Sequence, residues 1–120
     1  MRATRAAGSK AIWAIDPMHG NTITAAGRKT RILPDILAEL RCFFEVAWAE
    51  QVHPGGVHLE MTGEEVTECL GGTRGLREED LGRNYLTHCD PRLNGAQALD
   101  VAAEATRLIL EGTRAASDAA

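Results

Sequence analysis

The sequence of 120 residues predicts an α/β fold in which short buried strands alternate with helices. Two observations lead to this prediction. Short apolar runs alternate with segments whose apolar residues recur at the three- and four-residue spacing of amphipathic helices. Glycine or proline then ends most of these segments. Such an alternation implies a parallel sheet with right-handed crossovers, in the order strand, helix, strand, short helix, strand, helix.

The first expected strand covers residues 11–15, which are apolar. It ends at Asp16-Pro17, because proline cannot donate to a strand ladder and restricts the residue before it. The polar segment 18–29 predicts a loop at the strand end, a common place for functional sites. Residues 1–10 are basic and rich in small residues, so we expect a flexible N-terminal tail, with a targeting remnant as the alternative.

The clearest helix begins at Pro34 and ends before the breaker cluster His53-Pro54-Gly55-Gly56. Its apolar residues form one stripe: Ile36, Leu37, Leu40, Phe43, Phe44, Ala47 and Trp48. We expect the aromatic pair of this stripe to pack in the core rather than to bind a ligand.

The second expected strand lies in residues 55–63, between glycine hinges, and its side chains alternate strictly. One face is apolar: Val57, Leu59 and Met61. The other face is polar: His58, Glu60 and Thr62. A buried carboxylate is costly unless it is paired or bound to a metal, so this polar face calls for a functional explanation.

Thr62 and Glu65 have the spacing of a capping box, which predicts a short helix through Leu70 that ends at Gly71-Gly72. The charged stretch that follows is expected to be a solvated connection with room for one helical turn.

Residues 85–89 predict a third short strand, which ends at Asp90-Pro91. Asn94 is expected to cap the final helix together with Gln97, and Gly112 to end it. The apolar side of this helix is expected at Leu99, Ala102, Ala103, Ile109 and Leu110. One domain would then cover residues 11–112, followed by a flexible tail over 113–120.

The composition excludes several classes of function. With 13 basic and 17 acidic side chains the net charge is −4, which argues against a nucleic-acid partner. No apolar run approaches the roughly 20 residues of a membrane span, so we expect no membrane partner. The cysteines Cys42, Cys69 and Cys89 form no disulfide framework, which favours the reducing cytoplasm.

Three polar side chains follow the three expected strands. His19 lies just after the first, Glu60 is late in the second and Asp90 ends the third. Because functional groups gather at the carboxyl ends of parallel strands, we expect these side chains to meet. One imidazole and two carboxylates suit Mn²⁺, Fe²⁺, Co²⁺ or Zn²⁺ better than Ca²⁺. From the spacing alone, an ordinary set of buried polar groups remains the alternative.

Six motifs occur in a specific order between about residue 12 and residue 110. They are Trp13 with Asp16-Pro17-Met18-His19-Gly20-Asn21-Thr22, Lys29-Thr30-Arg31, Phe43-Phe44-Glu45, Gly55-Gly56-Val57-His58-Leu59-Glu60, Val66-Thr67-Glu68-Cys69-Leu70-Gly71-Gly72 and Cys89-Asp90-Pro91-Arg92-Leu93-Asn94. This series resembles the C-terminal part of class II 3-deoxy-D-arabino-heptulosonate 7-phosphate (DAHP) synthases. The resemblance implies a (β/α)₈ barrel that joins phosphoenolpyruvate to erythrose 4-phosphate in the shikimate pathway.

The resemblance also implies the roles of individual residues. His19, Glu60 and Asp90 match the family's histidine, glutamate and aspartate metal ligands, which would hold Mn²⁺, Co²⁺ or Zn²⁺. Lys29 and Arg31 match a stretch beside the substrates and would act with His19 as catalytic residues, holding phosphate or carboxylate oxygens.

His58 and Arg92 also match motif positions. Each would contact substrate or, with equal weight, orient a neighbouring carboxylate. The family's fourth ligand is a cysteine of the N-terminal part; Cys69 and Cys89 are expected to be buried small residues and not replacements for it.

The chain supplies about three of eight β/α units, so the resemblance implies a partial barrel equivalent to the last strands. An uncovered sheet face then predicts self-association, or a partner subunit that supplies the missing strands. Three roles stay open: a DAHP synthase-like enzyme with small phosphorylated or carboxylate substrates, a complementing subunit of a split synthase, and a non-catalytic fragment that binds a metal or metabolite.

Overall fold

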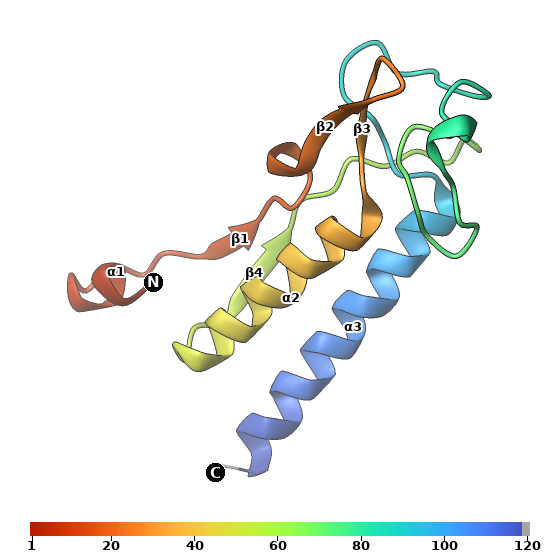
Figure 1. Cartoon of the computed structure of the whole chain (residues 1–120). Coiled ribbons are helices and arrows are strands. Elements are labelled where there is room, and N and C mark those ends of the chain that lie inside the picture. The colour runs from red at the N-terminus through yellow and green to blue at the C-terminus, as the bar shows by residue number, and fades with distance from the viewer. Residues whose placement is uncertain (119–120) are drawn as a thin grey trace.

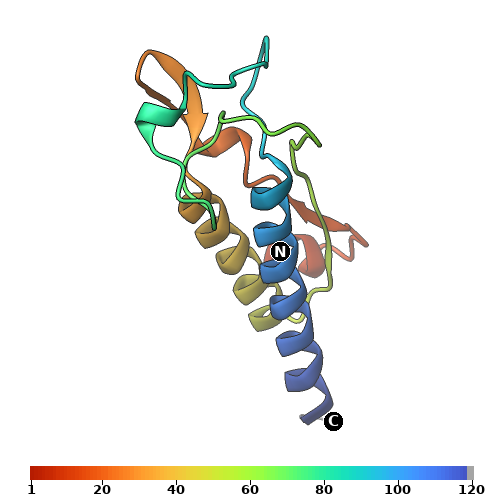
Figure 2. The same cartoon turned by 90° about the vertical axis from the view of Figure 1, so that its right-hand side faces the viewer.

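The computed structural model describes residues 1–118 and combines a pair of long helices with short strands (Figure 1). The helices α2 (Leu33–Ala49) and α3 (Gly95–Asp118) lie side by side and run in the same direction. The loops that carry the polar motifs gather at the N-terminal end of this pair (Figures 1 and 2). The expected α/β class is therefore confirmed, while the strands of the described residues form two small sheets and no closed barrel.

Two short parallel strands pack beside α2. Strand β1 (Trp13–Ile15) pairs with β4 (Pro54–Val57), with Ile15 opposite Val57. A Cβ atom on Gly55 would lie 3.0 Å from the carbonyl oxygen of Trp13, so glycine suits the close approach of the two strands there. The second strand is shorter than expected. The chain nevertheless continues beside β1 for one more residue, where the amide of His58 donates to the carbonyl of Ile15.

The segment after β4 forms a further parallel contact. Met61 makes an isolated parallel bridge with Leu93, directly before α3. The core face expected for the second strand is only partly correct: Val57 and Leu59 pack against the core, but Met61 is 50% exposed.

The loop expected at residues 18–29 is wrong. A 3₁₀ turn, η1 (His19–Asn21), is followed by a hairpin of β2 (Thr22–Ala25) and β3 (Arg28–Arg31). The two turn residues, Ala26 and Gly27, both have positive φ, of 48° and 72°, as a tight hairpin turn requires. Alanine seldom adopts this conformation, so the residue types at this turn do not indicate a hairpin.

The helix expected from Pro34 is confirmed as α2. Its buried side chains are Leu33, Ile36, Leu40, Phe43, Phe44 and Ala47. The two phenylalanine rings pack edge to face, with centroids 5.6 Å apart, in the largest apolar cluster of the described chain. Their expected place in the core is therefore correct.

The capping of α3 is confirmed but its end is not. Asn94 Oδ1 accepts from the Gln97 amide, and Gln97 Oε1 accepts from the Asn94 amide, which is a reciprocal capping box. The helix continues past Gly112 to Asp118. Gly112 is a helical residue against which the Trp48 ring packs, since a Cβ atom there would lie 2.0 Å from Trp48 Cε2.

The apolar side expected for α3 is also wrong. Gln97, Val101 and Leu108 face the core, whereas the expected residues Leu99 and Leu110 are 72% and 50% exposed. The helix carries two apolar stripes, and the sequence alone did not show which one the core covers.

Two further expectations fail in the connection between β4 and α3. The short helix expected through Leu70 and the strand expected over 85–89 are both absent from the described residues. The single turn η2 (Glu78–Asp80) does form in the solvated stretch. A short helix, α1 (Arg2–Ala6), lies within the expected N-terminal tail, whose flexibility stays a prediction. Of the helices in residues 1–118, none combines the length and apolar character that crossing a bilayer demands.

Candidate metal centre

The three predicted ligands meet in space. His19 opens η1 after β1, Glu60 follows β4, and Asp90 lies in the loop before α3. One ligand atom from each lies within 4.8 Å of the other two. His19 Nε2 is 3.7 Å from Glu60 Oε1. The geometry therefore brings one nitrogen and two oxygen donors to one point, whereas metal binding there stays a prediction.

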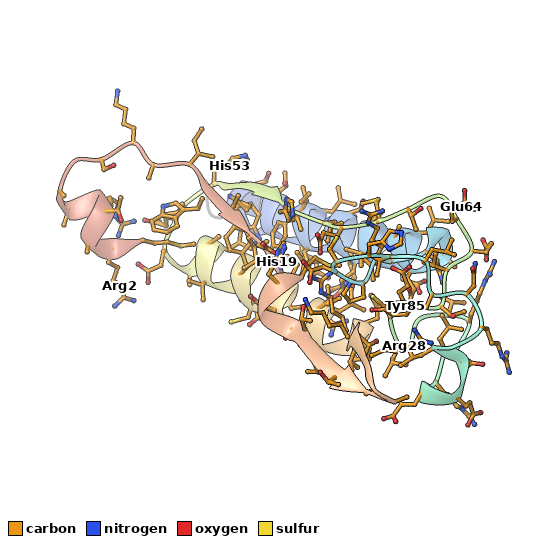
Figure 3. All side chains as sticks on the ribbon, turned by 90° about the horizontal axis from the view of Figure 1, so that it is seen from above. Arg2, His19, Arg28, His53, Glu64 and Tyr85 are labelled. Atoms are coloured by element: carbon orange, nitrogen blue, oxygen red, sulfur yellow. The ribbon has the colours of Figure 1, made fainter. Side chains whose placement is uncertain are left out.

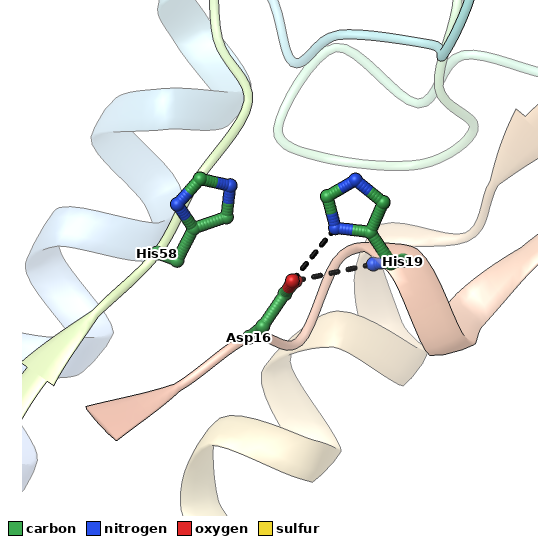
Figure 4. A group of neighbouring side chains, drawn as sticks. All are labelled: Asp16, His19 and His58. Atoms are coloured by element: carbon green, nitrogen blue, oxygen red, sulfur yellow. Dashed lines mark hydrogen bonds and ion pairs between the residues drawn. The ribbon is translucent and has the colours of Figure 1, made fainter. Parts of the chain in front are cut away.

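Asp16 fixes the orientation of the His19 ring (Figure 4). Its Oδ2 atom lies 2.7 Å from His19 Nδ1, while Oδ1 accepts from the amides of Met18 and His19. Burial alone would raise the pKa of the Asp16 carboxyl, but these hydrogen bonds outweigh it and hold that pKa below its ordinary value. A carboxylate only accepts, so Nδ1 carries a proton, and Nε2, on the side of Glu60, is the ring nitrogen that could bind a metal.

His58 lies beside this pair. Its ring stacks on that of His19 with centroids 5.8 Å apart and an angle of 26° between the planes (Figure 4). Asp16, His19 and His58 also have ligand atoms within 4.8 Å of one another, and all three are exposed. His58 thus lies on the solvent-exposed side of the centre, next to His19. Its contact with substrate stays a prediction.

Arg31 is a fully buried cation behind the centre. Its Nη1 atom lies 2.6 Å from Glu60 Oε2 and donates to the carbonyl of Pro91, while Nε donates to Thr22 Oγ1. The contact with Glu60 is close but not aligned as a hydrogen bond, so the buried Oε2 keeps an unused lone pair. Glu60 Oε1, on the side of His19 Nε2, is the oxygen placed to bind a metal, while Arg31 holds the carboxylate from behind.

The Nη2 atom of Arg31 is also buried without a hydrogen-bond partner. Through Nη1, the guanidinium contacts both the Glu60 carboxylate and the Pro91 carbonyl, and it so connects Glu60 to the Asp90 loop (residues 85–92). Its expected contact with a substrate anion stays a prediction.

Lys29 supplies the second cation. Its Nζ atom donates to Asp90 Oδ1 over 3.1 Å. This hydrogen bond lowers the pKa of the Asp90 carboxyl below its ordinary value, against an opposing effect of burial. Two cations thus face the two carboxylate donors, so that a divalent cation would make the centre electropositive and suited to anionic substrates. Arg92, the remaining predicted contact residue, is exposed on the same loop.

The cysteines differ from one another. Burial raises the pKa of the Cys69 thiol to about 12, so it stays a neutral thiol, as expected for a buried small residue. Cys89 is exposed, and its expected burial is wrong, because Asp90 and its neighbours form an open loop instead of a strand.

One residue of this region was missed at the sequence level. Glu68 is 1% exposed, and its carboxylate accepts hydrogen bonds from the loop that carries Asp90. The one signal for it is a lone acidic residue between apolar positions, next to Cys69 and Leu70. A glutamate there is expensive to bury unless it has partners.

Comparison with known proteins agrees with the motif resemblance. Residues 1–106 match the sequence model of the class-II DAHP synthetase family. A phospho-2-dehydro-3-deoxyheptonate aldolase of Streptomyces coelicolor is 52% identical over 98 residues, which is 81% of this chain and 22% of that protein. The aldolase AroG of Mycolicibacterium smegmatis is 52% identical over 99 residues, or 82% of this chain and 21% of that protein.

The chain thus spans about a fifth of the length of these curated relatives. The family match includes the segment expected to be an N-terminal tail, and it contains every predicted ligand and contact residue. On the strength of this match and of the motifs, the chain belongs to the class-II DAHP synthetase family.

Proposed function

We propose that this chain forms the metal-binding part of a site for the aldol-type condensation of phosphoenolpyruvate with erythrose 4-phosphate or a related aldehyde. The convergence of His19, Glu60 and Asp90 within 4.8 Å is the observation that carries the proposal. The names of the two aldolase relatives support the reaction class, and the motif resemblance implies its place in the shikimate pathway.

The three converging residues would hold the divalent cation, with Mn²⁺, Fe²⁺, Co²⁺ and Zn²⁺ as the candidates. When bound in such a site, a cation of this kind supplies polarisation of a carbonyl oxygen. Asp16 keeps His19 Nε2 free to bind it, and Arg31 places Glu60.

The cationic side chains would hold the anionic groups of both substrates. Lys29 and Arg92 are exposed and would contact phosphate or carboxylate oxygens, whereas the buried Arg31 needs a local opening to do so. In the condensation, C3 of phosphoenolpyruvate bonds to the aldehyde carbon, water adds at C2, and the C2–O bond to phosphate breaks. Fixed positive charge stabilises the negative charge of the departing phosphate.

The topology supports a partial barrel of about three β/α units. β1 pairs in parallel with β4, and the segment after β4 bridges in parallel to Leu93, so that three consecutive segments run side by side in one direction. The parallel helices α2 and α3 follow the first and third of these segments. The open edges would be closed by a second copy or by a chain that carries further strands, and light scattering above 12.9 kDa would support this.

An exchange experiment tests the proposal. The segment of the Streptomyces coelicolor relative that aligns with this chain is replaced by the matching residues of this chain. The folded chimera is expected to release phosphate from phosphoenolpyruvate in the presence of erythrose 4-phosphate and Mn²⁺. His19→Ala and Lys29→Ala should abolish this release, while Lys10→Ala in the exposed N-terminal segment should not.

The same assay separates the open roles. Activity of the chain alone would favour an independent enzyme, and activity only on mixing with the remainder of the relative would favour a complementing subunit. A folded chimera without activity would contradict the proposal and leave a non-catalytic binding role.

A further inference from the structure

We propose that Glu68 is a positioning residue that holds the Asp90 loop (residues 85–92) against the hairpin and thereby sets the place of the Asp90 ligand. This inference rests on the proposed metal centre. It assigns a role to a buried side chain that bonds to backbone amides of this loop and not to the side chain of a predicted ligand.

Both carboxylate oxygens of Glu68 bond to the Asp90 loop. Oε1 accepts from the amides of Leu86 and Thr87 over 2.9 and 2.8 Å, and Oε2 accepts from the amide of Arg92 over 2.8 Å. These amides lie on both sides of Asp90, so that one side chain clamps the loop before and after the ligand. The bonds also explain why no strand forms over 85–89, since the amides that a strand ladder would need are already taken.

The backbone around Glu68 is tied to the hairpin. Thr30 Oγ1 donates to the Glu68 carbonyl over 2.8 Å, and the amide of Leu70 donates to the carbonyl of Arg31 over 2.8 Å. β3 also carries Lys29, which bonds to Asp90 itself. Glu68 therefore fixes the loop to the same strand that presents the cationic partner of the ligand.

Further contacts brace the rest of the loop. Tyr85 donates to the Lys29 carbonyl over 2.9 Å, and the Arg28 guanidinium lies 5.0 Å from the centre of the Tyr85 ring (Figure 3). Thr87 Oγ1 donates to the Asp90 carbonyl within the loop. These contacts leave the loop some support without Glu68, so a variant at this position is expected to shift Asp90 rather than to unfold the chain.

Glutamine is the informative substitution at Glu68. It has the same shape, but one carboxylate oxygen becomes an amide that donates. If the remaining oxygen keeps the two amides of Leu86 and Thr87, the new donor faces the amide of Arg92, two residues after Asp90. Glu68→Gln thus removes the contact that lies nearest to the ligand.

The test measures Mn²⁺ binding to the full chain by electron paramagnetic resonance in four forms: wild type, Glu68→Gln, Asp90→Asn and the double variant. We expect Glu68→Gln to weaken binding about tenfold, as for other residues that support a ligand. If Glu68 acts through Asp90, then the double variant should bind within about twofold of Asp90→Asn alone. Glu64→Gln, on an exposed side chain of the same connection, is the matched control and should bind as the wild type does.

Two results would overturn the inference: Glu68→Gln binding Mn²⁺ as tightly as wild type, or the effects of Glu68→Gln and Asp90→Asn multiplying in the double variant. A wild type that binds no Mn²⁺ would instead contradict the proposed function.

Hydrogen exchange of backbone amides in the wild type tests the clamp by Glu68 directly. This measurement needs no metal and no folded Glu68→Gln variant. The amides of Leu86, Thr87 and Arg92 should exchange more slowly than that of His88 in the same loop. Equal rates at all four amides would show that the carboxylate does not hold the loop.

Discussion

The helical region and the site end of this chain are stabilised in different ways. The helical region, defined as α2, the part of α3 after Gln97 and the side chains between them, is held by apolar packing around Leu40, Phe44 and Leu108. The site end, defined as residues 16–22 and β3 together with residues 58–71 and 85–97, contains the buried polar side chains of the described chain. These are Thr30, Arg31, Glu68, Asn94 and Gln97.

The difference shows how the metal centre can be rigid without regular structure. Its segments are short, and much of their order comes from side chains that bond to backbone groups: Arg31 to Pro91, Glu68 to Arg92 and Gln97 to Cys69. Such bonds are costly to leave unmade once they are buried. A substitution in the helical region should therefore lower global stability, whereas one at the site end should act first on ligand geometry.

The largest expected effect is on the helical region. Leu40→Ala removes a side chain of 0% exposure and should lower the free energy of unfolding by about 3 kcal/mol through lost burial and a residual cavity. Val46 lies on the same helix and is 44% exposed, so Val46→Ala should change the free energy of unfolding by less than about 0.5 kcal/mol. Urea denaturation measures both, and equal effects of the two variants would contradict the assigned core.

Gly112→Ala should lower the free energy of unfolding by about 1–3 kcal/mol, although alanine favours helix formation more than glycine. The reason is the Trp48 ring, which would lie 2.0 Å from the new Cβ atom. Gly95→Ala, at the start of the same helix with no atom within 4 Å of its Cβ position, is the control and should not destabilise the chain. A more stable Gly112→Ala variant would show that the two helices pack less closely than described.

At the site end, Asp16→Asn should weaken Mn²⁺ binding about tenfold while leaving the unfolding midpoint nearly unchanged. An asparagine no longer fixes the proton on Nδ1 of His19, so the competing tautomer places it on Nε2. Nitrogen chemical shifts of the imidazole report the tautomer, and Asp35→Asn at the exposed start of α2 is the matched control. An unchanged tautomer and affinity would remove the orienting role of Asp16.

The smallest expected effect concerns the ion pairs of Glu104, one with Arg107 within α3 and one with Arg41 on α2. The hydrogen bond from Arg107, together with Arg41, lowers the pKa of Glu104 to about 2. A lowered folded-state pKa stabilises the chain above the ordinary pKa of 4.5, and this contribution is lost as the pH falls from about 4.5 to about 2.

Melting curves recorded between pH 6 and pH 2 should therefore show a smaller acid-dependent loss of stability for Glu104→Gln than for wild type. The difference is expected to be about 1 kcal/mol, because the Arg107 side chain is half exposed and solvent screens the pair. Glu111→Gln, on the more exposed partner of Arg107, should follow the wild type.

The sequence predicted the parts of the molecule that follow apolar periodicity. α2 and the Asn94–Gln97 cap of α3 were found because burial and capping leave local patterns. The meeting of His19, Glu60 and Asp90 was also expected, from the rule that polar residues gather at the carboxyl ends of parallel strands. Family kinship followed from the order of the motifs.

Other features depend on contacts between distant residues, which no local pattern shows. The strand expected over 85–89 does not form, and two of its amides, those of Leu86 and Thr87, donate to the distant carboxylate of Glu68 instead. Gly112 does not end α3, because Trp48 packs against it. The hairpin turn relies on a positive φ at Ala26, which its residue type disfavours.

The coordination of Mn²⁺ by His19 Nε2 tests the metal centre most directly. Pulsed electron paramagnetic resonance of the Mn²⁺-loaded chain should detect coupling to one imidazole nitrogen. This coupling should vanish in His19→Ala and persist in His53→Ala, an exposed histidine near β4. A nitrogen coupling that survives in His19→Ala, or one that vanishes in His58→Ala while His19 is intact, would contradict the site.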